Sequence, residues 1–264
     1  MTSESKHIAI AVNDLSIGYF RRKKALAVAK PINFKIESGN LIALVGANGI
    51  GKSTLLRTLS GMQAKLKGSI KICGKELSGY SSLERATQLS VVLTEAPASG
   101  NLTVRELVSL GRQPYTGSFG FLSEKDKEMI DNALSTTETT SLEHRKCYEL
   151  SDGQMQRVVI ARALAQDTPL IFLDEPTTHL DLYHRAYILK LLKRLTAENG
   201  KTVLFSTHEI DLGIQLADVM LVMDDLGFHQ GSPQQLIEDG KFNNLFPEDT
   251  IEFDASNGRF TIKN

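Results

Sequence analysis

The stretch Leu41–Leu59 reads LIALVGANGIGKSTLLRTL, and three kinds of segment follow one another along it. It begins with an unbroken apolar run, which is typical of a strand covered on both faces. A loop with three glycines follows, and from Lys52 onward the apolar residues have helical spacing. The stretch therefore predicts a buried strand, a tight loop and a helix, the unit from which α/β folds are built.

The loop matches a phosphate-binding pattern, because Gly46, Gly51, Lys52 and Ser53 occupy the fixed positions of GxxxxGK[ST]. Glycines let backbone N–H groups surround a phosphate, and the helix start adds a partial positive charge. A glycine turn without function is the alternative, and the position between an apolar strand and a helix argues against it. We expect Lys52 to reach the β and γ phosphates and Ser53 to bind Mg2+. The predicted nucleotide-binding residues are Gly46, Ala47, Asn48, Gly49, Ile50, Gly51, Lys52, Ser53 and Thr54.

Two later strand patterns end in residues suited to hydrolysis. In LIFLDEP, at 170–176, Asp174 is predicted to hold Mg2+, and the adjacent Glu175 is predicted to orient or deprotonate the attacking water. Two acids that merely cap a strand are the alternative. His208 ends the pattern TVLFST and is predicted to bond the γ-phosphate, since ligands of open α/β sheets bind at the carboxyl ends of strands. A structural histidine is the alternative there. Lys52, Glu175 and His208 are the predicted catalytic residues.

Two other features also point to a nucleotide. Tyr19 follows a short strand pattern and offers an aromatic face to adenine, although a core tyrosine fits the pattern equally well. The stretch LSDGQ at 150–154 begins a helix with the N-cap cluster Ser151, Asp152 and Gly153. Because a helix start attracts anions, this is a second anion site in a chain that already has one.

The order of patterns predicts one domain, 1–264, with two inserted parts. Strand alternation near Ile8–Val12, in INFKIESGN at 32–40 and in SIKICG at 69–74 predicts a small antiparallel sheet. Residues 81–165 have mostly helical periodicity and predict a helical subdomain within an α/β core formed by 1–80 and 166–264. The tail is expected to add a helix and a hairpin around Asn257 and Gly258.

Composition excludes several classes of protein. The chain has 30 basic and 31 acidic residues and a formal charge of −1, so no strong field for nucleic acid is expected. Cys73 and Cys147 lie far apart without metal-ligand spacing, which favours a reducing, cytoplasmic setting. No apolar run reaches the roughly 20 residues of a membrane span, and MTSESKH lacks an apolar signal core. The protein is therefore expected to act from one side of a membrane.

Together these motifs resemble the ATP-binding-cassette family, specifically its ATPase subunit, over almost the whole chain. GANGIGKST resembles the Walker A loop, LIFLDE the Walker B strand, LSDGQ the signature written LSGGQ, HLD at 179–181 the D-loop, and STH at 206–208 the switch histidine. The resemblance implies a P-loop NTPase cassette with a RecA-like core, an N-terminal antiparallel β subdomain and an inserted helical subdomain. It also implies ATP and Mg2+ as cofactors.

The resemblance offers an explanation for the second anion site. In this family two cassettes face each other head to tail, so that the signature helix of one subunit closes over ATP bound to the other. It implies that a second copy of this chain is contacted in trans by Ser151, Asp152, Gly153, Gln154 and Asp181. Binding of ATP would join the dimer, and hydrolysis would part it.

Two positions depart from the family pattern. Asp152 replaces the first signature glycine and adds a negative charge near a phosphate. Glu95, in VVLTEAPA, stands where the Q-loop glutamine is usual, and we expect it to keep a role near the metal. Ser53, Asp174 and Glu95 are thus the predicted metal-proximal residues.

A last segment indicates a subclass. NLTVRELVSLGRQPY at 101–115 resembles importers of iron complexes such as siderophores, heme and, more distantly, cobalamin, although TVRELV alone also describes an amphipathic helix with a threonine cap. The resemblance implies a membrane permease dimer as partner, an indirect link to a substrate-binding protein, and a peripheral location at the cytoplasmic face of the membrane. The alternatives are a soluble mechanical ATPase and a regulatory module without hydrolysis. The resemblance also implies that the cargo does not touch this subunit.

Overall fold

The computed structural model describes residues 7–21, 24–94, 101–117, 120–246 and 250–263. The chain divides into two compact units, which we call the nucleotide-loop unit (Met1–Tyr80 with Leu192–Asn264) and the helical unit (Ser81–Leu191). The helical subdomain was expected over 81–165, whereas the helical unit extends to Leu191. It includes the strand that begins at Leu170, because this strand pairs with another strand of the same unit. The domain limits drawn from the sequence remain a prediction.

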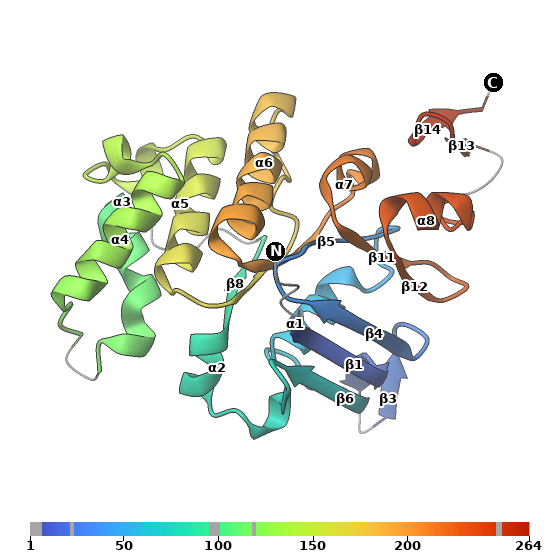
Figure 1. Cartoon of the computed structure of the whole chain (residues 1–264), viewed down its shortest axis with the longest axis horizontal. Coiled ribbons are helices and arrows are strands. Elements are labelled where there is room, and N and C mark those ends of the chain that lie inside the picture. Colours follow the sequence, from blue (N-terminus) through green and yellow to red (C-terminus); the bar gives the residue numbers. More distant parts are fainter. Residues whose placement is uncertain (1–6, 22–23, 95–100, 118–119, 247–249, 264) are drawn as a thin grey trace, which may run out of the picture. The chain divides into compact units, whose positions relative to one another are not determined.

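The small antiparallel sheet that the alternating patterns predicted is present in the nucleotide-loop unit (Figure 1). Its strands follow the order β4-β1-β6-β7. In β4 every second residue is buried, since one face of this sheet covers the core. Strand β1 continues past the alternation of Ile8–Val12 to Ser16, with an irregular register between Val12 and Leu15. The strands are β1 (Ile8–Ser16), β4 (Ile32–Glu37), β6 (Lys67–Ile72) and β7 (Lys75–Glu76), followed by the 3-10 turn η1 (Leu77–Gly79).

The second sheet of this unit contains the apolar strand that precedes the glycine loop. Its strands in this unit follow the order β12-β11-β5-β10, and β5 pairs in parallel with both of its neighbours. All six residues of β5 are buried, which explains its unbroken apolar run. The elements are β5 (Leu41–Gly46), α1 (Lys52–Leu59), β10 (Thr202–Ser206), β11 (Val219–Met223) and β12 (Phe228–Gly231).

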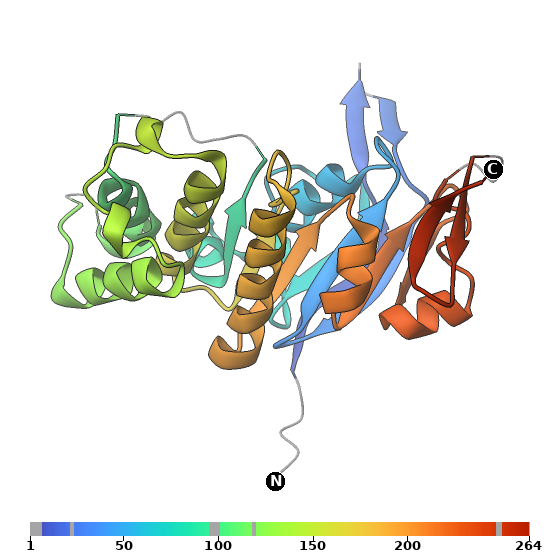
Figure 2. The same cartoon turned by 90° about the horizontal axis from the view of Figure 1, so that it is seen from above.

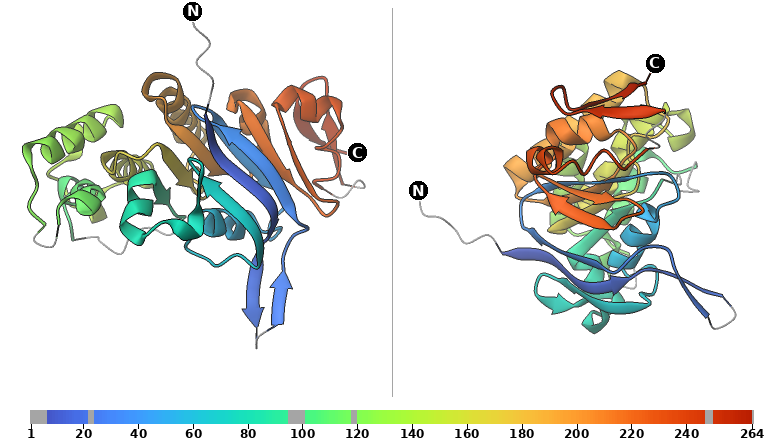
Figure 3. Two further views of the ribbon diagram at one scale, coloured as in Figure 1. Left: turned by 60° about the horizontal axis from the view of Figure 1, so that its bottom comes forward. Right: turned by 90° about the vertical axis from the view of Figure 1, so that its right-hand side faces the viewer.

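Two hairpins complete the nucleotide-loop unit. The hairpin of β2 (Gly18–Arg21) and β3 (Lys24–Ala27) extends beyond the antiparallel sheet (Figure 3), and the sequence patterns did not predict it. The expected C-terminal hairpin is present as β13 (Ile251–Asp254) and β14 (Arg259–Ile262), beside α7 (Ile210–Leu216) and α8 (Pro233–Glu238) (Figure 2). Phe253 of this hairpin packs against both Phe242 and Phe260.

The helical unit contains a helical bundle and one pair of strands. Helices α3, α4 and α5 enclose an apolar core, and β8 (Leu89–Val92) pairs in parallel with β9 (Leu170–Leu173). Its helices and turns are α2 (Ser82–Gln88), α3 (Val104–Ser109), η2 (Leu110–Tyr115), α4 (Glu124–Thr136), η3 (Thr140–Leu142), η4 (Cys147–Glu149), α5 (Asp152–Ala165) and the first part of α6 (Leu182–Asn199). Serine or threonine capping boxes start α2, α3, α4 and α5.

Candidate nucleotide site

The glycine loop between β5 and α1 is held tightly against β11. A Cβ atom added at Gly46 would lie 2.5 Å from the Met223 carbonyl oxygen, so only glycine fits there. Gly51 precedes α1 with φ of 112°, a conformation that glycine adopts without strain. No acidic residue occupies the first turn of α1, so no side chain of that turn competes with an anion for the helix start.

The Lys52 side chain lies inside this loop. It is 4% exposed, and its Nζ donates to the carbonyl oxygens of Gly46, at 2.8 Å, and Ala47, at 3.0 Å. These carbonyls hold the ammonium group at the loop. A phosphate oxygen would add a negative partner to a cation that is already positioned.

Tyr19 is tied to the same helix. Its hydroxyl lies 2.9 Å from Thr54 Oγ1, and the residue is 53% exposed. The bond brings the β2–β3 hairpin to α1, while much of the ring surface stays accessible. Tyr19 is therefore not a core tyrosine, and its ring is available for stacking on a base.

His208 follows β10 and is exposed. Because β10 runs parallel to β5, with Ser206 opposite Leu44, both strands end at the same edge of the sheet. The Thr207 N–H donates to the Leu44 carbonyl, which continues the pairing as far as the residue before His208. The structure thus brings Tyr19, the glycine loop and His208 together within one unit.

Asp174 and Glu175 lie at the end of β9 in the helical unit. Asp174 is 5% exposed, and its backbone is fixed on both sides, since its N–H donates to the Val92 carbonyl and its carbonyl accepts from Thr94 Oγ1 at 2.9 Å. Thr94 ends the described part of the segment that follows β8, and sequence reasoning missed it. Glu95, the predicted metal-proximal residue, lies outside the described residues.

Glu175 has a strained backbone. Its φ is 52°, a left-handed conformation that costs a glutamate of the order of 1 kcal/mol or more. The Thr178 N–H donates to the Glu175 carbonyl, and Thr178 Oγ1 donates to Glu175 Oε2 at 3.2 Å. The turn therefore holds the carboxylate in a defined position, as a residue that orients water requires.

The start of α5 has the predicted N-cap. Ser151 Oγ accepts from the Gln154 N–H at 3.4 Å, and Gln154 Oε1 accepts from the Ser151 N–H at 3.1 Å. Each side chain thus accepts a hydrogen bond from the backbone N–H of the other residue, which is a capping box. The Asp152 residue between them is exposed. Gly153 is buried, and its α-carbon faces the ring of His184.

Asp181 caps the next helix. Its Oδ1 accepts from the His184 N–H at 2.8 Å, and its carbonyl accepts from the Arg185 N–H, which is N-cap geometry for α6. The backbone and ring hydrogen bonds from His184 lower the pKa of the Asp181 carboxyl. Asp181 therefore carries a negative charge and a helix-capping role in the same side chain.

The family comparison supports these motifs. The ABC transporter family matches residues 29–178, more than half of the chain. The chain belongs to the ABC transporter family. The RecA-like and β-subdomain architecture expected from the resemblance is confirmed, and the family reaction is ATP hydrolysis.

Three relatives illustrate the similarity. An uncharacterised ABC transporter ATP-binding protein of Methanocaldococcus jannaschii is 33% identical, over 97% of this chain and 87% of that one. The achromobactin transport ATP-binding protein of Dickeya dadantii is 36% identical, over 90% and 87%. The iron(3+)-hydroxamate import ATP-binding protein of Bacillus subtilis is 38% identical, over 81% and 78%.

Two solved structures have the same fold. A transporter described as metal-chelate type, in an inward-facing conformation, aligns with a TM-score of 0.78 at 29% identity, over 90% of this chain and 89% of that one. A dimeric ATP-binding cassette in a post-hydrolysis state, bound to ADP and phosphate, aligns with a TM-score of 0.74 at 26% identity, over 85% and 98%.

The GRQPY segment that indicated a subclass of ABC transporters turns out to build the helical unit. Arg112, 3% exposed, donates from Nε to Asp126 Oδ1 at 2.8 Å and from its guanidinium to the Ala165 carbonyl. Tyr115 donates to the Gln166 carbonyl and lies under the Arg112 guanidinium. At Gly111 a Cβ atom would lie 2.3 Å from the Arg162 carbonyl oxygen. These residues join η2 to α4 and α5.

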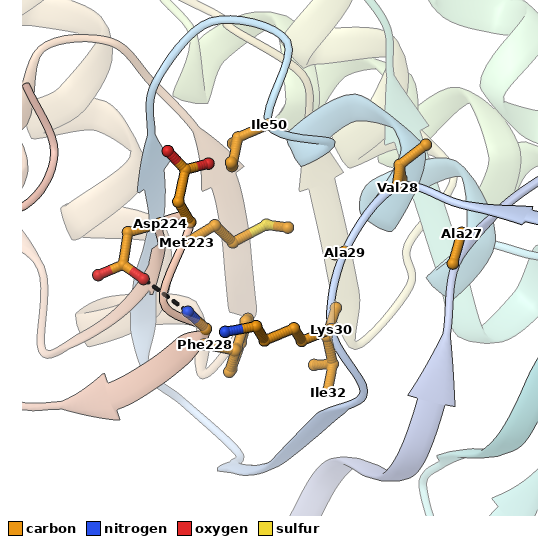
Figure 4. Close-up of a pocket in the computed structure, with 11 residues that line it drawn as sticks. Ala27, Val28, Ala29, Lys30, Ile32, Ile50, Met223, Asp224 and Phe228 are labelled. Atoms are coloured by element: carbon orange, nitrogen blue, oxygen red, sulfur yellow. Dashed lines mark hydrogen bonds between the residues drawn. The ribbon is translucent and has the colours of Figure 1, made fainter.

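A cavity of about 310 Å3 lies beside the glycine loop (Figure 4). Of the predicted nucleotide-binding residues only Ile50 lines it, together with Lys30, Asp224 and Phe228. Lys30 Nζ donates to the Leu226 carbonyl, and Asp224 Oδ1 accepts from the Gly227 N–H, so these polar groups stabilise the loop before β12. The cavity neighbours the glycine loop, and Lys52 and Ser53 are not among the residues that line it.

Among the described residues no helix is long and apolar enough to cross a membrane. Both cysteines are free. No group of three or more acidic, histidine or cysteine side chains is preassembled for a metal in the parts of the chain that the structure describes.

Proposed function

We propose that this chain is the ATP-hydrolysing subunit of an importer of iron complexes and works as a head-to-tail dimer on the cytoplasmic face of the membrane, bound to a permease. One observation carries the proposal: relatives 36–38% identical over most of the chain are transport and import ATP-binding proteins for achromobactin and iron(3+)-hydroxamate. This similarity favours transport over a soluble mechanical ATPase. The NLTVRELVSLGRQPY segment agrees with it.

The roles of the site residues follow from their chemistry. Lys52 and the loop amides bind the β and γ phosphates, and the exposed ring of Tyr19 stacks on adenine. Glu175 orients or deprotonates water, and His208 bonds the γ-phosphate. Ser151, Asp152, Gly153, Gln154 and Asp181 face the nucleotide of the second copy.

Mg2+ suits the available donors. The Ser53 hydroxyl and the Asp174 carboxylate are oxygen ligands, and Mg2+ favours one or two protein oxygens completed by phosphate oxygens and water. Such a site would be completed by the nucleotide. Bound Mg2+ would neutralise charge on the phosphates. Glu95 is proposed to lie near it.

The dimer and the chemistry are tested by Glu175→Gln, which keeps the size of the side chain and removes its basicity. We expect the variant to bind ATP but to release phosphate at least 100-fold more slowly, since general-base catalysis contributes about 10²–10⁴-fold. An ATP-dependent dimer should then accumulate, as measured by light scattering. Glu198→Gln, an exposed residue of α6, is the matched control. Normal turnover by Glu175→Gln would require another base.

The cargo class is tested in cells. Uptake of radiolabelled iron presented as a ferric hydroxamate or a carboxylate siderophore should depend on this chain and disappear in a strain that carries Lys52→Ala. Copurification with a membrane permease should persist in that variant, because the Lys52 side chain is buried and does not offer a surface for a permease. Uptake that is unaffected by loss of the chain would contradict iron-complex import.

A further inference from the structure

One side chain of the helical unit contacts both the signature turn and the D-loop. His184, in the first turn of α6, packs its ring against Gly153 of α5 and bonds Asp181 through Nδ1. From the sequence, the histidines other than His208, His184 among them, are expected to have surface or packing roles. Its position is notable because Gly153 and Asp181 are both proposed to face the nucleotide of the second copy.

The contact with Gly153 explains why a glycine stands there. Gly153 lies within helix α5 and has no positive φ, so backbone freedom is not the reason. A Cβ atom at this position would lie 2.5 Å from His184 Cδ2 and 2.9 Å from Cγ, closer than any real contact. The glycine therefore makes room for the imidazole ring, and the ring in turn limits how the first turn of α5 can move.

The contact with Asp181 has a defined direction. The Nδ1 atom lies 2.8 Å from Asp181 Oδ1, and the same oxygen accepts from the His184 N–H. An ionised carboxylate only accepts hydrogen bonds, so Nδ1 is the donor. Two bonds from one residue thus fix the carboxylate rotamer, and the His184 ring orientation is fixed with it.

The D-loop is joined in turn to Glu175. Arg185 Nε donates to the Leu180 carbonyl at 2.5 Å, and the Leu180 N–H donates to the Thr177 carbonyl. The neighbouring Thr178 bonds Glu175. A short series of hydrogen bonds and one packed ring therefore leads from the hydrolytic carboxylate to the signature turn within one chain.

We propose that His184 is a positioning residue that couples the D-loop, and through it Glu175, to the signature turn. This inference rests on the proposed dimer, in which Glu175 serves the nucleotide of its own chain and the signature turn serves the partner's nucleotide. In that arrangement His184 links the two nucleotide sites of the dimer. Its contribution is to geometry, not to the chemical step.

Two substitutions separate its contacts. His184→Phe keeps a ring against Gly153 but loses the Nδ1 donor, and His184→Asn keeps an amide donor for Asp181 but loses the ring. His184→Ala loses both. His144→Ala is the control, because His144 belongs to the same unit, its side chain is 87% exposed, and no proposed role involves it.

Nucleotide assays of the full chain should show a split between KM and kcat. We expect His184→Ala to raise the KM for ATP, and the ATP concentration needed for dimerisation in a Glu175→Gln background, by about 2- to 30-fold, the range typical of coupling residues. The kcat at saturating ATP should change less than twofold. The variants His184→Phe and His184→Asn should each raise the KM for ATP by less than His184→Ala does. The control His144→Ala should leave the KM unchanged.

Hydrogen exchange tests the physical link without nucleotide. In His184→Ala, amides at 152–156 and 178–182 should both exchange faster, whereas His144→Ala should leave them unchanged. Faster exchange at only one of these segments, or an unchanged KM for ATP, would overturn the coupling role. If Glu175→Gln with His184 intact fails to dimerise at saturating ATP, the proposed dimer itself fails, and the coupling between sites fails with it.

Discussion

Lys52 is the buried charge to which we assign phosphate binding. Its Nζ is already surrounded by loop carbonyls, so its removal leaves those oxygens without their cation and the phosphate without its counter-charge. Because a charged hydrogen bond is worth about 1.5–3 kcal/mol, Lys52→Ala should weaken ATP binding by about 10- to 100-fold. Titration calorimetry measures this, with the exposed Lys71→Ala as control. If Lys52→Ala bound ATP as tightly as the unchanged protein does, a phosphate-binding role for Lys52 would be excluded.

Tyr19, a residue of β2, is joined to α1 by a hydroxyl contact with Thr54. Tyr19→Phe and Thr54→Val each remove this bond but keep the ring, so each should reduce ATP affinity by about fivefold, in line with roughly 1 kcal/mol per hydrogen bond. Tyr19→Ala also removes the stacking face and should cost more. The double variant Tyr19→Phe with Thr54→Val should be no worse than either alone. Additive losses would show that the two hydroxyls act separately.

At the scale of elements, α5 and α6 meet where Gly153 accommodates His184. Alanine is favoured over glycine in a helix by about 1 kcal/mol, yet Gly153→Ala displaces the ring and its hydrogen bond. The substitution should therefore be neutral or destabilising with His184 present and stabilising in a His184→Ala background. Urea unfolding of the unchanged protein, Gly153→Ala, His184→Ala and the double variant measures the coupling between the two positions. The same effect of Gly153→Ala in both backgrounds would mean that the ring does not constrain the helix.

The helices of the helical unit are joined by the buried pair of Arg112 and Asp126. Removing one partner of such a pair leaves an uncompensated charge, so Arg112→Ala should destabilise the protein by about 3–5 kcal/mol. Asp126→Asn, which keeps the shape, should cost less. Thermal unfolding against the exposed control Lys127→Ala checks the order of these effects. If Arg112→Ala lowered the free energy of unfolding by less than about 1 kcal/mol, as expected for an exposed ion pair, the role of the buried pair would be contradicted.

The same pair makes stability depend on pH. Hydrogen bonds from Ser123, followed by Arg112, lower the pKa of Asp126 to about 2. The unfolded value is about 3.9, so the stabilisation is complete above about pH 5 and is lost as the pH falls towards 2. Asp126→Asn should show a smaller loss of stability over that window. Urea midpoints measured between pH 6 and pH 3 test this, and parallel curves for both proteins would contradict it.

For the whole molecule, nucleotide binding should appear as stabilisation. A ligand at 100 times its dissociation constant adds about 2.7 kcal/mol to the native state. MgATP should therefore raise the Tm of Glu175→Gln by several degrees, and the shift should grow with protein concentration if a dimer forms. Lys52→Ala should lose most of the shift. A concentration-independent Tm for Glu175→Gln would argue that each chain binds nucleotide alone.

The sequence by itself determined the features that depend on local pattern. The apolar run before Gly46, the GKST that follows the loop, the Ser151 cap and the strand leading to Asp174 are contiguous signals, and each predicts its element because period, cap and turn chemistry act within a few residues. The family and its reaction followed from the order of those motifs along the chain.

Tertiary structure alone decided which distant side chains meet. The bond between Tyr19 and Thr54, the burial of Arg112 against Asp126, and the ring of His184 on Gly153 join residues 14 to 35 positions apart. No periodicity encodes such contacts, because they arise when separately formed elements pack and exclude water from the space between them. For that reason the sequence could name Gly153 and Asp181, whereas only the folded chain showed that one imidazole contacts both.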